Sequence, residues 1–213
     1  SPSCGLEKVE VYNTDLSEVT HNGRGLFATV FTAFNPHIPT IEGEKLNDVE
    51  QAEHFLARVH FFHEWQHKGK NGWNANKIMQ FHNENKLFLL SRAPQIKPVL
   101  GRLIATRLDE KAHPEIIALE YMTKAQKALH FMTKKGRIAH TMERVFGRFS
   151  HQLSKQERQE LIELIHGFRQ GLVPRSAPLL LLNKYLGRYN LIDKNINRFI
   201  NPVPLEMDLM SQV

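Results

Sequence analysis

Residues 75–213 alternate between amphipathic segments with helical spacing and short breaks of proline or glycine, a pattern typical of a bundle of helices. A capping box in Ser154 to Glu157 begins one helix, Gly171 ends it, and Pro114 begins another. An extended tail with two prolines closes the segment. We expect helices at about 75–90, 95–109, 113–134, 137–152, 154–171, 177–189 and 193–200.

Residues 1–66 have a more mixed pattern. Residues 6–12 alternate apolar and charged side chains, as in a short strand, and a glycine-rich turn at 22–25 precedes a helix at about 26–34. A second helix is expected from about Val49 to Trp65, and residues 66–74 then lose the apolar repeat, as a linker would. We therefore predict a mainly α protein, in which a partial α/β unit in 1–66 is joined to an all-helical domain in 75–213.

The charge changes sign at the same linker. Residues 1–74 carry 6 Lys and Arg against 10 Asp and Glu, whereas residues 75–213 carry 22 against 12, and the whole chain has a net charge of +6. A basic helical unit is suited to a polyanionic partner such as nucleic acid. The alternative is a solvated basic surface with no specific partner.

Several classes of protein are disfavoured by composition. No apolar run approaches the ~18–20 residues of a membrane span, so we expect no membrane partner. The single cysteine excludes an internal disulfide and fits a reducing, cytoplasmic location. We read the twelve histidines as scattered, with no HExxH or paired CxxC spacing, and expect no metal site made by this chain alone. We identify no catalytic triad, P-loop or dinucleotide-binding fingerprint.

The helix expected at 137–152 has a cationic stripe. Its basic side chains step by 3, 4, 4 and 3 residues, which places them on one face, opposite an apolar face. Such a face can follow a phosphate backbone, although amphipathic helices commonly have charged outer faces for solubility alone. The stripe consists of Arg137, His140, Arg144, Arg148 and His151, and Lys134 and Lys135 extend it at the start.

A second candidate cluster contains His82, Lys86 and Arg102. His82 and Lys86 lie one helical turn apart, and Arg102 follows Gly101, where a helix can approach closely. These side chains could bind a phosphate or a base edge. The alternative is that His82 is a hydrogen-bonded core histidine and Lys86 an ordinary surface residue.

The order of several short motifs resembles a known family. The segments 1–9, 23–28 and 46–48 resemble the second half of the thiouracil desulfidase domain, beginning with Ser1-Pro2-Ser3-Cys4-Gly5. The segments 81–86, 100–105, 171–174, 178–179 and 201–204 resemble the helical domain often fused behind it. The combination is similar to bacterial enzymes that remove sulfur from 4-thiouridine in tRNA.

This resemblance implies an iron–sulfur mechanism. In that family three cysteines hold a 4Fe-4S cluster, whose open iron takes the sulfur of the thiolated base. Cys4 matches the last of these ligands, and Ser1 and Ser3 match the neighbouring serines, with Ser1 favoured for a catalytic role. The helical domain is the expected tRNA-binding module.

The resemblance also implies that part of the site lies outside this sequence. The other two cluster cysteines and the catalytic acid would precede Ser1, so we expect a fragment that is inactive and holds no cluster by itself. An incomplete unit in 1–66 would expose apolar surface and favour self-association. The alternatives are a helical protein-interaction module with an acidic partner, and a desulfidase of free thiouracil.

Overall fold

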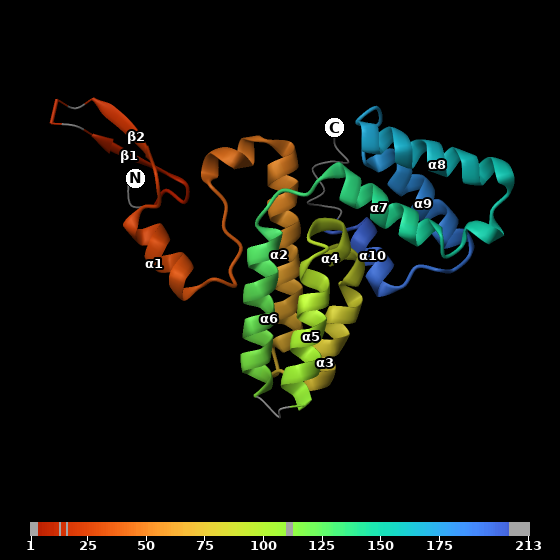
Figure 1. The fold of residues 1–213 in the computed structure, drawn as a ribbon, viewed down its shortest axis with the longest axis horizontal. Helices are drawn as coiled ribbons and strands as arrows, with labels where there is room; N and C mark the ends of the chain where they lie inside the picture. Colours follow the sequence, from red (N-terminus) through yellow and green to blue (C-terminus); the bar gives the residue numbers. More distant parts are fainter. Residues whose placement is uncertain (1–3, 13, 16, 110–112, 205–213) are drawn as a thin grey trace.

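The computed structural model describes residues 4–12, 14–15, 17–109 and 113–204. Over these residues the protein is mainly α, as predicted. A hairpin and one helix precede a series of packed helices (Figure 1). The elements are β1 (Lys8–Tyr12), β2 (Glu18–Asn22), α1 (Leu26–Phe34), the 3₁₀ helix η1 (Gly43–Asn47), α2 (Val49–Gly69), α3 (Ala75–Glu84), α4 (Lys86–Arg92), α5 (Ile96–Asp109), α6 (Pro114–Leu129), α7 (Lys135–Phe146), the 3₁₀ helix η2 (Ser150–Gln152), α8 (Lys155–Gln170), α9 (Ser176–Arg188) and α10 (Lys194–Ile200).

The N-terminal unit is small and lies beside the bundle. Strands β1 and β2 pair antiparallel, with Val9 opposite His21, and α1 follows them on the same side of the molecule (Figure 1). The helix at 26–34 has the predicted bounds. We did not predict β2, because the five residues EVTHN have little apolar alternation, and pairing with β1 defines the strand.

A first hydrophobic core is formed by α2 to α6. Phe61 of α2 is fully buried, and its ring lies 5.1 Å from that of Phe81 and 5.2 Å from that of Phe88. Helix α2 continues to Gly69, four residues beyond its predicted end, because the chain keeps packing against the bundle there; only residues 70–74 of the predicted linker form a turn, at which Trp73 packs on Trp65 with ring centroids 5.3 Å apart. The packing therefore groups α2, which precedes the predicted boundary at 66–75, with the helices that follow it.

A second core is formed by α7 to α10. Its buried side chains include Met142, Leu161 and Leu182. Helix α4 takes part in both cores, since Phe88 faces the first and Leu87 the second. In Figure 1 α4 and α10 accordingly lie between the upright helices α2, α3, α5 and α6 and the group α7 to α9. Across the described ranges, we find no helix with both the length and the hydropathy needed to cross a bilayer.

Two of the predicted helices are interrupted. The helix expected at 75–90 breaks at Asn85, which is buried and whose side-chain amide donates to the carbonyl of Phe81 at 2.8 Å. The helix expected at 137–152 ends at Phe146, and the turn that follows brings Phe149 into the second core. In both cases a residue turned inward by packing ends a helix that the periodicity would have continued.

Candidate nucleic-acid interface

One residue of each predicted basic cluster acts electrostatically on the same lysine, Lys97. Lys86 lies on α4, Lys97 on α5 and Arg144 on α7, and α4 contacts both other helices. Partial burial lowers the pKa of Lys97, and the positive charges of Arg144 and then Lys86 lower it further. We call Lys86, Lys97 and Arg144 the basic patch. Lys97 was missed from sequence, although it lies one turn before Gly101, on the face already singled out.

The outer face of α7 adds exposed cations to this patch. Its acid, Glu143, accepts from Arg169 of α8 at 2.6 Å and lies 3.7 Å from His140. These neighbours balance the charge of Glu143, so the face keeps an excess of cations. Arg148 is exposed beyond the end of α7, and His151 is exposed in η2. Only the part of the predicted stripe up to Arg144 therefore lies on a single helix, α7.

The beginning of the stripe has different contacts. Arg137 is half-buried and donates to the backbone carbonyl of Arg92 at 3.1 Å, so it helps to fix α7 on α4. Lys135 lies 4.0 Å from the carboxylate of Glu50 on α2, and Lys134 is exposed at the N-terminus of α7. Arg137 is therefore poorly placed for phosphate, whereas both lysines are accessible.

His82 has the geometry of a core histidine. It is buried, and its Nδ1 lies 3.1 Å from the hydroxyl of Tyr121. Burial lowers the pKa of His82 to about 4, with contributions from Lys86 and Lys97, so the ring is neutral near pH 7. A buried neutral ring is unsuited to binding phosphate. His82 therefore fits the alternative prediction of a hydrogen-bonded core histidine. Of its predicted partners, Lys86 is half-buried and Arg102 is exposed.

A buried ionic cluster joins the two cores, and sequence reasoning missed it. Glu53 of α2 accepts from Arg175 at 2.9 Å and from Arg92 at 3.3 Å, and Arg92 also donates to His54 Nδ1 at 3.2 Å. Burial opposes ionisation of Glu53, but the two arginines outweigh it and lower the pKa of its carboxyl. The available signal was a run of charged residues, Glu53, His54 and Arg58, on the apolar side of α2.

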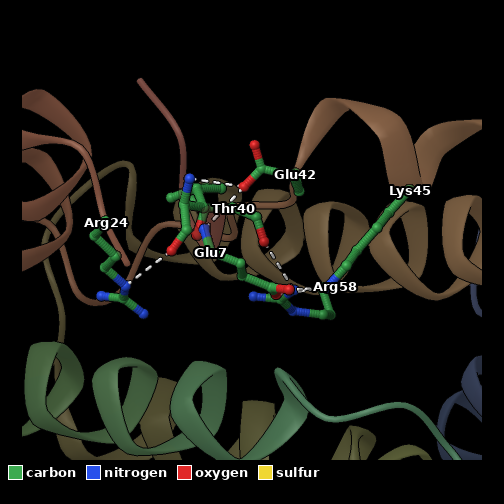
Figure 2. A network of polar contacts seen from close by, with 7 residues as sticks. Glu7, Arg24, Thr40, Glu42, Lys45 and Arg58 are labelled. Carbon is green, nitrogen blue, oxygen red and sulfur yellow. Dashed lines mark hydrogen bonds and ion pairs between the residues drawn. The ribbon is translucent and has the colours of Figure 1, made fainter. Parts of the chain in front are cut away.

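A polar network places the N-terminal segment against the helices (Figure 2). Glu42 accepts from the amides of Leu6 and Glu7 at 2.7 and 3.0 Å, and Lys45 forms an ion pair with Glu7. Arg24 donates to the carbonyl of Leu6 at 3.1 Å. The chain just after Cys4 is thereby fixed beside η1 and the start of α2.

The donor set of this chain does not fit a four-iron cluster by itself. Cys4 is the only cysteine and is exposed, whereas such a cluster requires several thiolates. Ser1 and Ser3, the predicted catalytic residues, lie outside the described residues.

The reading of the histidines as scattered was wrong. His63, Glu64 and His67 have the spacing of the HExxH motif, and His60 lies one turn earlier on the same helix. The donor atoms of His60, His63 and Glu64 lie within 4.8 Å of one another. The histidine spacing therefore does not support the expectation that this chain makes no metal site.

Together these features define a mainly α protein with two helical cores joined by α4 and a basic patch beside the junction. Residues 86–204, more than half of the chain, match the family described as "Protein of unknown function (DUF1722)", and the chain belongs to this family. It is also similar to "Uncharacterized protein YbgA" of Escherichia coli (strain K12), with 23% identity over 134 residues, which cover 63% of this chain and 79% of that protein. No solved structure matches the chain.

Proposed function

We propose that the chain binds RNA through the basic patch and the exposed cations of α7. The observation that carries this proposal is the convergence of Lys86, Lys97 and Arg144 from three helices, where the charges acting on Lys97 are both positive. Like charges held together are unfavourable in the free protein, and a polyanion relieves this repulsion while releasing its condensed counterions.

The more specific part of the proposal rests on the resemblance of the sequence. We propose that the chain is part of an iron–sulfur-dependent desulfidase acting on 4-thiouridine in tRNA, with the helical part holding the tRNA. The excess of basic residues in 75–213 supports this division of labour. The contacts of Glu42 with Leu6 and Glu7 support it as well, because they hold the segment of Cys4 against the helices. The 4Fe-4S cluster would need ligands beyond this chain.

Binding of bulk tRNA across a salt series tests the RNA proposal. A Lys97→Glu/Arg144→Glu variant is compared with Lys155→Glu/Lys184→Glu, which changes the net charge equally at exposed positions on α8 and α9. We expect micromolar affinity at low salt, a loss of about tenfold or more in the first variant, and a salt slope reduced by about 2. Equal losses in both variants would show that net charge, and not the patch, governs binding.

An acidic protein partner is the competing function. Polyglutamate carries closely spaced negative charges without phosphates or bases, so it serves as a competitor against tRNA at matched charge. Displacement of tRNA only by a large excess of polyglutamate supports RNA binding. Displacement at equal charge concentration would favour the interaction module. Desulfidation of free thiouracil is tested separately, by comparing thiouracil with thiolated tRNA as substrates of a protein that includes the additional cluster cysteines.

We also propose self-association through the N-terminal unit. Helix α1 exposes large apolar side chains, with Leu26 77%, Phe27 60% and Phe34 80% accessible, and this surface would be covered in a dimer. Sedimentation velocity at several concentrations should show a concentration-dependent dimer that Phe27→Ser/Phe34→Ser weakens. A monomer at every concentration would contradict this part of the proposal.

A further inference from the structure

A polar cavity of about 550 Å³ lies between α2, the end of α3 and α10. Its lining is charged on several sides, with His60 and Glu64 from α2, Asn85 from the α3–α4 junction, and Lys194 and Arg198 from α10. Neither the basic patch nor the resemblance to desulfidases uses this cavity. A cavity of this size and polarity is large enough for a small polar ligand.

Three metal-binding side chains gather at the edge of this cavity. His60, His63 and Glu64 occupy positions i, i+3 and i+4 of α2, which share one side of a helix. Nε2 of His60 lies 3.9 Å from the carboxylate of Glu64, and donor atoms of all three residues lie within 4.8 Å of one another. Ligands at about 2.1 Å from a tetrahedral zinc ion lie about 3.4 Å apart, so small rotations about the side-chain bonds would close this group on a metal.

The two histidines that the structure brings together differ from the pair in the HExxH motif. The HExxH spacing alone would pair His63 with His67, whose rings lie 6.5 Å apart, but His67 is not part of the group that the donor atoms form. His60 takes its place, with its ring stacked on that of His63 at 6.1 Å. His60 and Glu64 also line the cavity, so a metal ion held by them would border it.

Arg198 gives an independent indication of a ligand in the same cavity. Its Nε donates to Asn85 at 3.3 Å, but its Nη2 is buried and has no hydrogen-bond partner among the described residues. Leaving a buried donor unsatisfied costs about 1–3 kcal/mol, and more for a charged group. Arg198 lines the cavity near Glu64, whose negative charge acts on it, and a guanidinium that lines a cavity is suited to a carboxylate or phosphate oxygen.

We propose that His60, His63 and Glu64 hold one divalent transition-metal ion of the zinc type, with an open coordination position toward the cavity. A small anion in the cavity contacts Arg198 and fills that position. The two parts depend on each other, because an anion between the metal and Arg198 offsets the repulsion of the two cations. Three protein ligands and one exchangeable ligand are the arrangement found in zinc sites that bind substrates.

Zinc binding to the 213-residue chain, prepared without a polyhistidine tag and treated with a chelator, tests the site. Isothermal titration should give one Zn²⁺ per chain, and Co²⁺ should give visible d–d absorption bands. We expect His63→Ala to weaken Zn²⁺ binding by about 100-fold or more, since loss of even an outer-shell partner costs 10–100-fold. His63 is exposed, so circular dichroism should show an unchanged fold.

The matched control is His113→Ala. His113 is exposed and lies 3.2 Å from Glu115, which makes it a histidine–carboxylate pair outside the group of three donors. This change should leave Zn²⁺ binding unaltered. Equal affinity in the parent chain and the His63→Ala variant would overturn the proposal, as would equal losses in both variants.

Sulfate serves as the probe for the anion. Zinc affinity should rise severalfold in sodium sulfate relative to sodium perchlorate at matched ionic strength, after correction for zinc sulfate formed in solution. By reciprocity, zinc should tighten sulfate binding by the same factor. An unchanged zinc affinity would refute the role given to Arg198 and leave a metal site alone.

Discussion

Replacement of Glu53 by glutamine should destabilise the protein more than any other conservative change in α2. The substitution keeps the shape of the side chain but removes the negative charge that compensates Arg92, which is 5% exposed, and Arg175. Removal of one partner from a buried ion pair costs about 3–5 kcal/mol, because an uncompensated charge stays in the interior. Since the three residues join α2, α4 and the start of α9, the loss weakens the contact between the two cores.

Thermal unfolding followed by circular dichroism measures this effect. For a chain of this size a loss of 3–5 kcal/mol corresponds to a fall in melting temperature of about 6–20 °C. The pKa of Glu53 is lowered in the folded protein, so its contribution is present above the usual carboxyl pKa and is lost as the pH falls below it. Glu53→Gln should therefore flatten the acid limb of the stability curve.

Glu50→Gln is the control for this prediction. Glu50 is exposed on the same helix, 4.0 Å from Lys135, and an exposed pair of this kind contributes about 0–1 kcal/mol. If Glu53→Gln melted within about 2 °C of the parent chain, the ionic cluster would not hold the two cores together.

Three further changes test other parts of the fold. His82→Gln should reduce the loss of stability between pH 6.5 and 4, because the folded-state pKa of His82 is lowered to about 4 and protonation therefore favours unfolding. Urea titrations at several pH values measure the free energy of unfolding, and the same pH dependence in both proteins would contradict this. Gly171→Ala should cost about 1 kcal/mol, since φ is +80° at the end of α8, whereas Gly136→Ala, with open space around its Cβ position, should cost little; equal melting temperatures for the two variants would be the contrary result. Glu42→Ala should speed hydrogen exchange of the Leu6 amide, because Glu42 accepts a hydrogen bond of 2.7 Å from that amide. Unchanged protection of the Leu6 amide would mean that other contacts fix the segment.

Much of the fold follows from local sequence signals. The bounds of α1, α8 and α10 lie close to the predicted ones because caps and glycines mark them, such as the capping box that begins at Ser154 and the left-handed Gly171. The breaks at Asn85 and Phe146 were not predictable in this way. They depend on which side chains the neighbouring helices draw inward, and periodicity along one segment carries no information about that.

The candidate site was predictable to a smaller extent. Local spacing identified Lys86 and Arg144 on separate helices, but only the packing of α4 against α5 and α7 brings them to Lys97. Spacing also suggested His82 as a ligand, although its hydrogen bond to Tyr121, 39 residues away, makes it part of the core. The metal-binding spacing in α2 was readable from sequence and was overlooked.

The position of α2 in the first core has a practical consequence for anyone who shortens this chain. The family match begins at residue 86, yet Phe61 of α2 packs against Phe81 and Phe88, and loss of such a ring costs about 3–5 kcal/mol. A fragment cut at the family boundary would expose to solvent the apolar side chains of α4 and α6 that pack in the first core. Aggregation or weak binding of that fragment would result from the truncation and would not describe the intact chain. The shortest piece that retains both cores begins ahead of Val49, at the cap provided by Asp48.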